Sequence, residues 1–297
     1  MVKAITPEIK EQAIQWRAKI ISGTDIASFG YVTKYSLYTP ARGNLILIPG
    51  MASNCKTEPL FQEFITWGLR HKYDVYSLET FLGRFQPDVN LKYAQENTVP
   101  ELINLIDTGL ETIAKHASNN PMRIVAHSAG AVGTMFAINK QIAQKRPINI
   151  ENVTLFAPFI ADERFARIKK FYRLRSKSEE EFQRTPIRVE NPFVNPPQPR
   201  YISVLPAFFE QITNLNLVTP ETATYNFPVT IVGGGRDNKV PCDALQKLYK
   251  KLATLPNGER FQYVLFPKSN HSFISQSNNL FDILSRINPY IFHDIVR

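Results

Sequence analysis

Short apolar runs alternate along the chain with segments of helical periodicity. Six such runs are predicted to be strands: Leu45–Ile48, Tyr73–Leu78, Arg123–Ala126, Val153–Phe156, Val229–Val232 and Tyr263–Phe266. Between them, apolar residues recur every three or four positions, which predicts helices. The predicted helices are Thr57–Leu69, Pro100–His116, Ala131–Ala143, Cys242–Leu252 and Leu280–Ile287. Strands that are apolar on both faces and alternate with helices are typical of a mostly parallel, doubly wound α/β sheet.

The first forty residues carry a different pattern. Thr6, Pro7 and Glu8 resemble the N-cap, first-position proline and first-turn acid of a helix, which we expect to run to about Ile20. The segment 31–38 alternates and is rich in Tyr, Val and Thr, so it predicts a strand. A turn at 40–43 suggests that this strand forms a hairpin-like pair with the apolar run that follows it.

One long stretch breaks the alternation. Residues 160–226 contain no glycine and no clear strand, but they are rich in proline and in aromatic residues. This composition predicts a mainly helical and looping insertion between two strands of the sheet. The chain is therefore divided into an N-terminal core part (1–159), an insertion (160–226) and a C-terminal core part (227–297).

The composition excludes several classes of protein. Hydrophobic residues make up 43% of the chain, which argues against disorder, and no apolar run approaches the length of a membrane span. Two cysteines, Cys55 and Cys242, do not make a disulfide framework, and the first residues lack the apolar core of a signal peptide. We therefore expect free thiols and a cytoplasmic location. The net charge of +9 is spread along the chain, and no recognised nucleic-acid module accompanies it.

A candidate nucleophile follows the third predicted strand of the parallel series. Ser128 lies between that strand and a predicted helix, with the small residues Ala126 and Gly130 two positions on either side. A sharp strand–turn–helix apex of this kind exposes a nucleophilic hydroxyl, and small neighbours leave room for it. The N–H of Ala129, at the start of the helix, is a candidate donor to a developing oxyanion.

A serine nucleophile needs a base and an orienting acid, and both candidates follow strands. His271 comes after the last predicted strand and is the histidine of the five best placed to reach Ser128. Asp237 follows the preceding strand in a glycine-rich turn, with Asp162 as the alternative acid. Because reactive groups collect at the carboxyl ends of parallel strands, Ser128, Asp237 and His271 are expected to meet there.

The loop after the first apolar run completes the candidate site. Gly50 allows a close approach of the backbone to a substrate, so the N–H of Met51 is the candidate second oxyanion donor. We take Gly50, Met51 and His127 as the candidate substrate-binding residues. The site calls for no cofactor and no metal.

On these motifs the chain resembles the α/β-hydrolase-fold serine hydrolases, in the style of the monoacylglycerol lipase, lysophospholipase and carboxylesterase group. The resemblance implies a Ser–His–Asp triad on a mostly parallel sheet flanked by helices, with residues 160–226 in the position of the variable cap. The chain departs from the family pattern at Ala126, which replaces the first glycine of G-x-S-x-G, and at Pro49, which replaces a histidine. Neither departure removes a catalytic group.

These features predict hydrolysis of a carboxylic ester of an apolar or lipid-like acyl group. Thioester, amide or C–C hydrolysis and acyl transfer on the same triad remain alternatives, as does a non-catalytic binding protein. The basic, aromatic segment 164–175 fits either a solvated helix face, which is favoured, or peripheral contact with an anionic membrane.

Overall fold

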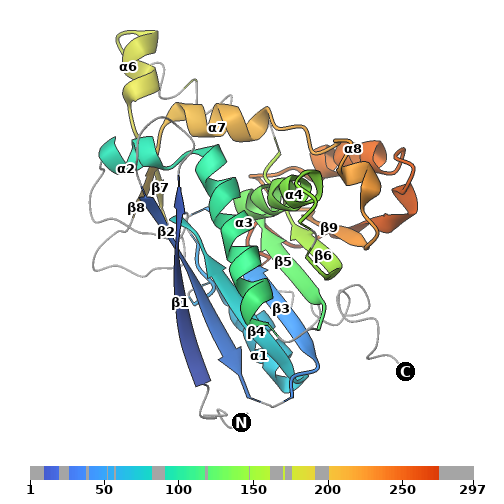
Figure 1. Ribbon diagram of the computed structural model, residues 1–297. Coiled ribbons are helices and arrows are strands. Elements are labelled where there is room, and N and C mark those ends of the chain that lie inside the picture. The colour runs from blue at the N-terminus through green and yellow to red at the C-terminus, as the bar shows by residue number, and fades with distance from the viewer. Residues whose placement is uncertain are drawn as a thin grey trace.

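The computed structural model describes residues 10–19, 27–37, 40–51, 53–56, 58–81, 91–117, 120–146, 148–160, 170, 176–190 and 201–273 (Figure 1). Within these ranges the chain folds around one eight-stranded sheet with the order β1-β2-β4-β3-β5-β6-β9-β10. The strands are β1 (Lys10–Lys19), β2 (Ala27–Ser36), β3 (Gly43–Ile48), β4 (Tyr73–Glu79), β5 (Met122–His127), β6 (Ile150–Phe156), β9 (Val229–Gly234) and β10 (Phe261–Phe266). All six predicted apolar strands are confirmed.

The direction of the strands changes across the sheet. β1, β2 and β4 pair antiparallel, whereas every pair from β4 to β10 is parallel. Every residue of β3 and β5 is buried, as a central strand covered on both faces requires. The carboxyl ends of the parallel strands consequently lie along the same edge of the sheet.

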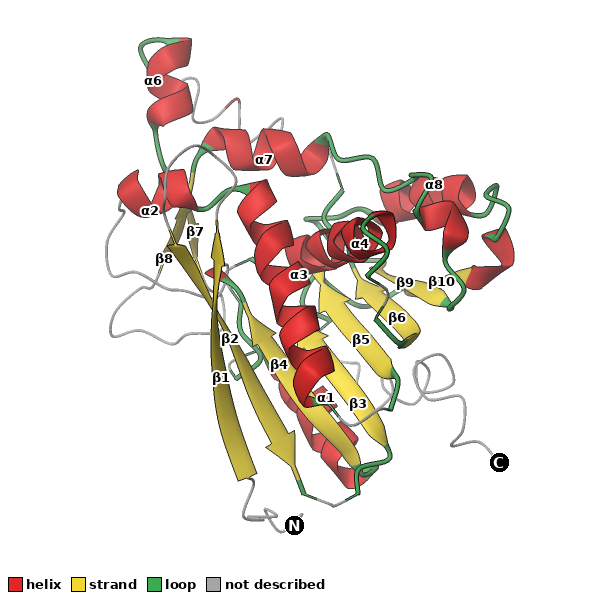
Figure 2. Ribbon diagram, in the orientation of Figure 1, coloured by secondary structure: helices red, strands yellow, loops and turns green. Residues whose placement is uncertain are grey.

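Helices cover both faces of this sheet. Figure 2 shows α3 (Val99–His116) and α4 (Ser128–Ala143) on the near face and α1 (Pro59–Arg70) behind the strands. The predicted helices 57–69, 100–116, 131–143 and 242–252 are confirmed, the last as α8 (Cys242–Leu252). Thr98 caps the N-terminus of α3, since its hydroxyl accepts the N–H of Glu101, and the helix buries an apolar face. The predicted helix 280–287 lies outside the described residues.

The prediction of an N-terminal helix is wrong, because residues 10–19 form the edge strand β1. The sequence contains both a helix-capping signal at Thr6 and a period-two pattern in which Ile14, Trp16 and Ala18 alternate with other residues. The period-two pattern is the one that matches the structure. The segment pairs with β2 along ten residue positions, and this pairing satisfies the backbone N–H and C=O groups that a helix would have satisfied internally.

The predicted hairpin between residues 31–38 and the next strand is also wrong. β4 lies between β2 and β3, so β2 pairs with β4 and not with its successor in the chain. β3 is fully buried and takes the centre of the sheet, whereas β2 has half-exposed positions that suit a place nearer the edge.

Residues 160–226 contain two short strands that the sequence analysis did not predict. β7 (Ile187–Glu190) pairs antiparallel with β8 (Tyr201–Val204) in a separate two-stranded sheet. The described helices of the segment are α6 (Glu179–Arg184) and α7 (Pro206–Thr213), with a single 3₁₀ turn at Thr222–Thr224. Strands of four residues bounded by prolines give too short an alternation to stand out in a sequence. The limits of the insertion stay a prediction.

Two other sequence expectations concern membranes. The basic segment 164–175 lies outside the described residues except for Lys170. None of the helices within the described ranges combines the length and the apolar character needed to cross a bilayer.

Candidate active site

The backbone at Ser128 makes a sharp turn between β5 and α4. Ser128 has a φ of 53°, in the left-handed region that side chains with a Cβ rarely occupy. It is the first residue of α4, and its side chain is almost fully buried. Ala126, one of the departures from the family pattern, is completely buried in β5, so its methyl group fits the site. The predicted strand–turn–helix apex is present.

His271 lies within hydrogen-bonding distance of both Ser128 and Asp237. His271 Nε2 is 3.0 Å from Ser128 Oγ, and His271 Nδ1 is 2.8 Å from Asp237 Oδ2. The carboxylate can only accept, so Nδ1 carries the proton and Nε2 is left to accept the serine hydroxyl. This arrangement is that of a nucleophile, a base and an acid that orients the base.

The two loops that carry Asp237 and His271 are tied together by their backbones. Gly235 N–H donates to the carbonyl of Phe266 at 2.9 Å, and Arg236 N–H donates to the carbonyl of Ser269 at 2.9 Å. These bonds continue the parallel pairing of β9 and β10 past the ends of the strands. The separation of the acid from the base is therefore set by main-chain contacts.

The environment of Asp237 keeps it ionised. Burial by itself raises the pKa of the carboxyl, but the hydrogen bond and the charge interaction with His271 lower it below its usual value. The N–H groups of Lys239 and Val240 add to this effect, since both donate to Oδ1, at 2.7 and 2.9 Å. Oδ2 is thereby left for His271.

The imidazole of His271 is held in its neutral form. Burial lowers its pKa, the hydrogen bond to Asp237 opposes this, and repulsion by His127 lowers it further, to about 4. A neutral imidazole is the form that can take a proton from a serine hydroxyl.

The loop after β3 packs directly against the turn at Ser128. A Cβ added at Gly50 would lie 2.8 Å from the Ser128 Cβ and 3.1 Å from the His127 carbonyl oxygen. A Cβ at Gly130 would collide with the carbonyl group of Pro49. The structure thus brings the segment that contains Met51 alongside the first turn of α4, which contains Ala129. Because Ala129 lies in that first turn, its N–H has no partner within the helix.

A buried acid–base pair that the sequence did not reveal lies beneath the candidate triad. Glu58 is fully buried at the N-cap position of α1, and its Oε1 is 3.1 Å from His127 Nδ1. His127 Nε2 is in turn 2.9 Å from the main-chain oxygen of His271. The signal in the sequence was only a carboxylate before Pro59, which reads equally well as an ordinary helix start.

His127 therefore has both ring nitrogens directed at protein groups, and only 4% of the residue is exposed. These contacts favour a supporting role for His127 over the substrate contact expected from the sequence. The prediction for Gly50 and Met51 stays open, and Met51 is half-buried beside the turn.

Two other histidines of the chain have surroundings different from those of His271. His71 follows α1 and stacks on Trp67, with ring centroids 3.7 Å apart, and His116 lies in the last turn of α3. Asp162, the alternative acid, is outside the described residues.

Cys55 is fully buried, and burial raises its thiol pKa well above the usual value, which disfavours the reactive thiolate. No group of ligating side chains suitable for a metal ion occurs among the described residues.

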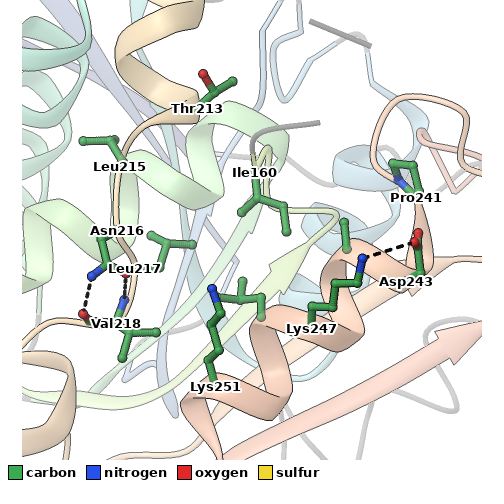
Figure 3. A pocket seen from close by; sticks show the side chains of 12 residues that line it. Ile160, Thr213, Leu215, Asn216, Leu217, Val218, Pro241, Asp243, Lys247 and Lys251 are labelled. Atoms are coloured by element: carbon green, nitrogen blue, oxygen red, sulfur yellow. Dashed lines mark hydrogen bonds and ion pairs between the residues drawn. The ribbon is translucent and has the colours of Figure 1, made fainter. Parts of the chain in front are cut away.

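A pocket of about 480 Å³ lies beside α8, and none of the three residues of the candidate triad lines it (Figure 3). Its walls come from the segment after α7 and from α8, together with Ile160 and Pro241. Lys247 faces Asp243 across one wall, with Nζ and Oδ2 4.0 Å apart. We do not take this pocket as the reaction site, because none of the hydrogen-bonded groups described above lines it.

Comparisons with known proteins identify the fold. Neither a family model nor a curated protein sequence matches the chain. A soluble variant of monoglyceride lipase from Saccharomyces cerevisiae has a similar structure, with a TM-score of 0.64 at 14% identity over 99% of this chain and 97% of that one. A putative hydrolase from Agrobacterium vitis S4 gives a TM-score of 0.61 at 15% identity, over 95% and 99% of the two chains. Est1E from Butyrivibrio proteoclasticus gives 0.59 at 14% identity, also over 95% and 99%.

The chain has the α/β-hydrolase fold. The sheet order, the parallel strands that carry the candidate triad and these structural neighbours agree on this point. Within that fold, the structures it is similar to include esterases and a monoglyceride lipase.

Proposed function

We propose that this protein is a serine hydrolase that cleaves carboxylic esters through an acyl-enzyme. The observation that carries the proposal is a pair of hydrogen bonds at His271, which donates to Asp237 through Nδ1 and accepts the hydroxyl of Ser128 through Nε2, on a serine with positive φ. A serine hydroxyl is a weak nucleophile unless a positioned base removes its proton. The similarity to esterases and a lipase gives independent support.

In the proposed mechanism, His271 Nε2 takes the proton of Ser128 as Oγ attacks the ester carbonyl. Asp237 holds the Nδ1–H tautomer and stabilises the imidazolium that forms, without itself taking the proton. His271 then protonates the leaving alcohol, which departs and leaves Ser128 acylated. His271 next activates a water molecule, whose attack releases the acid and restores the serine.

The negative charge on the tetrahedral oxygen needs donors that are already in place. We assign this role to the N–H groups of Met51 and Ala129, supported by the packing of Gly50 against Ser128 and of Gly130 against Pro49. Preorganised donors of this kind contribute on the order of 10²- to 10³-fold to turnover. The dipole at the start of α4 acts in the same direction.

The substrate that fits best is a small ester with an apolar acyl group. Est1E has been observed with ferulic acid bound, and the monoglyceride lipase with a substrate analogue. Residues 160–226 supply aromatic side chains near the core, among them Phe208 and Phe209, whose rings contact each other and those of Phe81 and Phe159. This supports the assignment of the segment as a cap over an apolar binding region.

The proposal is tested by reaction with a fluorophosphonate probe, which labels activated serines. We expect the wild-type protein to be labelled and Ser128→Ala to lose all labelling. Ser77→Ala removes a fully buried serine hydroxyl from β4 and should be labelled like the wild type. If the folded wild-type protein is not labelled while a reference serine hydrolase is, the proposal is wrong.

A panel of acyl donors distinguishes the ester hydrolase from the other reactions open to this triad. We expect p-nitrophenyl esters to turn over faster than matched thioesters and anilides. A competing alcohol acceptor should not divert the acyl group from water. Preferential formation of a new ester would instead identify an acyltransferase.

A solvated helix face is the favoured interpretation of the basic segment 164–175, and membrane contact is the alternative. It rests on the sequence, which carries six positive charges and no acid in that segment. Cosedimentation with anionic vesicles should fall when Arg167, Lys170 and Arg173 are replaced by glutamate. Equal cosedimentation of the two proteins would favour the solvated-face interpretation.

A further inference from the structure

The residue before Ser128 contacts the residue that activates Ser128. His127 Nε2 lies 2.9 Å from the main-chain oxygen of His271, and the two imidazole rings have centroids 4.8 Å apart. On its other side, His127 Nδ1 lies 3.1 Å from Glu58 Oε1. A continuous buried path of polar contacts therefore runs from the start of α1, beneath the triad, to the loop of His271.

The chemistry of these partners determines the charge of His127. A main-chain carbonyl oxygen can only accept, so Nε2 must carry a proton to donate to His271. The other nitrogen faces a carboxylate, which favours a proton on Nδ1 as well. With both nitrogens protonated the ring is an imidazolium, and Glu58 supplies the compensating negative charge.

The environment of the pair supports this assignment. Burial by itself raises the pKa of Glu58, but the charge of the nearby His127 and the hydrogen bond from Ser53 lower it below its ordinary value. Burial lowers the pKa of His127, and this is outweighed by Glu58, the carbonyl of His271 and the charge of Asp237, which raise it. Glu58, His271 and Asp237 are the titratable groups that act on His127 from the elements packed around it, and the buried thiol of Cys55 lies near Glu58.

The pair is shielded from solvent by aromatic side chains. Glu58 is fully buried, and the rings of Phe61 and Phe273 pack edge-on to the His127 imidazole at centroid distances of 6.5 and 6.4 Å. The second carboxylate oxygen of Glu58 accepts the hydroxyl of Ser53, which follows the Gly50 loop. Charges at such a site interact strongly because little water screens them.

We propose that Glu58 and His127 form a buried ion pair that positions His271 through its main-chain carbonyl and sets the proton affinity of its imidazole. Both are positioning residues, because neither touches the reacting atoms. The inference rests on the proposed function, in which His271 is the base. The imidazolium of His127 disfavours a second positive charge on His271, and Glu58 limits that effect so that His271 can still accept a proton during turnover.

The variant Glu58→Gln removes the negative charge and keeps the size of the side chain. The buried His127 should then lose a proton, and the positive neighbour of His271 disappears. We expect kcat per fluorophosphonate-titrated site to fall by about 10- to 100-fold, as for a misplaced catalytic group, with little change in KM. The acidic limb of the pH profile of kcat/KM should move to higher pH. Glu101→Gln, a fully buried carboxylate in the first turn of α3, is the matched control and should leave both quantities unchanged.

Two substitutions at His127 separate positioning from charge. His127→Gln keeps an N–H donor for the His271 carbonyl but carries no charge, whereas His127→Leu has neither. We expect His127→Gln to retain more of kcat than His127→Leu, and the acidic limb of the pH profile of kcat/KM to move upward equally in both variants. If His127→Gln and His127→Leu have the same kcat, the hydrogen bond to the His271 carbonyl does not position the base.

A measurement independent of activity decides the charge itself. In ¹⁵N-labelled wild-type protein, the imidazole of His127, assigned by its loss in His127→Gln, should remain doubly protonated from pH 6 to 8. In Glu58→Gln it should be neutral at pH 8, and the pKa of His271 should rise. A neutral His127 in the wild type at pH 7, or an unchanged His271 pKa in Glu58→Gln, would overturn the inference. Because these resonances are read without substrate, this result stands even if no ester is hydrolysed and the proposed function fails.

Discussion

Gly50 packs against Ser128 so closely that a Cβ at position 50 would lie 2.8 Å from the Cβ of Ser128. Contacts between real Cβ atoms and their neighbours are longer than this, so any side chain at Gly50 must displace the turn that holds the proposed nucleophile. The backbone oxygen of His127 lies 3.1 Å from the same added atom, which is also closer than an ordinary contact. The loop after β3 and the turn after β5 therefore form one packed unit.

Replacing Gly50 with alanine should reduce turnover more than it reduces stability. The added methyl shifts either Ser128 or the Met51 N–H by a few tenths of an ångström or more, and we expect kcat/KM to fall by about 10- to 100-fold. The control Gly68→Ala introduces a similar overlap, 2.7 Å from Val75 Cγ2, at the interface of α1 with the sheet. Both variants should lose about 1–3 kcal/mol of unfolding free energy in urea, with kcat retained only in the control. Equal kcat in the two variants would contradict this prediction.

Replacing Asp237 with asparagine should abolish most of the turnover while leaving the protein folded. An amide can donate to His271 Nδ1 and so favour the wrong tautomer, which presents an N–H to Ser128 in place of a lone pair. The expected loss of kcat is about 10⁴-fold. Asp74→Asn, which alters a buried carboxylate paired with Lys34 at 2.8 Å outside the site, should retain kcat. Appreciable turnover by Asp237→Asn would point to another acid.

The pH dependence should follow the protonation of His271. Because burial and the neighbouring His127 lower its pKa to about 4, the imidazole stays neutral well below pH 6.5. The proposed mechanism requires the neutral form, so kcat/KM should hold from neutral pH downward and fall only as the pH approaches 4. Initial rates measured across this range with a substrate that does not ionise test this. A midpoint near pH 6.5 would show that His271 has the proton affinity of an exposed histidine.

The lowered pKa of His271 also makes the free energy of unfolding depend on pH. The unfolded chain binds a proton at His271 below about pH 6.5, whereas the folded protein does so only near pH 4. Protonation therefore favours the unfolded state over this interval, and this contribution lowers stability as the pH falls. Urea unfolding should be measured between pH 7 and 5. We expect the free energy of unfolding to fall less over this range in His271→Gln than in the wild type. Parallel losses in the two proteins would exclude this contribution.

A buried hydrogen bond outside the site should affect stability alone. Tyr225 Oη donates to Asn139 Oδ1 at 2.6 Å, joining the segment before β9 to helix α4, and Tyr225 is almost fully buried. Tyr225→Phe leaves that oxygen with fewer partners and should cost about 1–3 kcal/mol of unfolding free energy. Turnover of the folded variant should match that of the wild type. A reduced kcat with unchanged stability would show that α4 transmits the change to Ser128.

Much of the fold could be predicted because the buried strands carry their own pattern. The run Leu45–Ile48 is apolar at successive positions, as a strand covered on both faces requires, and Val153–Phe156 has a single polar residue, Thr154. The errors in predicting the fold lie where strand pairing, and not the local hydrophobic pattern, decides the structure. Residues 10–19 follow a helix-start signal at Thr6 but themselves alternate as a strand does, and the available edge of β2 selects the strand. The short strands β7 and β8 stabilise each other by pairing across a gap in the sequence, which local patterns do not record.

The candidate triad could be located from the sequence because each of its members follows a strand, and parallel strands end at a common edge. Ser128, Asp237 and His271 needed only their chain order and their strands to be placed together. The sequence alone thus determined the sheet core and the identity of these three groups. Tertiary structure alone decided that Glu58 and His127 lie beneath them, because that contact joins the start of a helix to a turn 69 positions away and depends on burial. Charge, tautomer and proton affinity follow from surroundings that form only when the chain has folded.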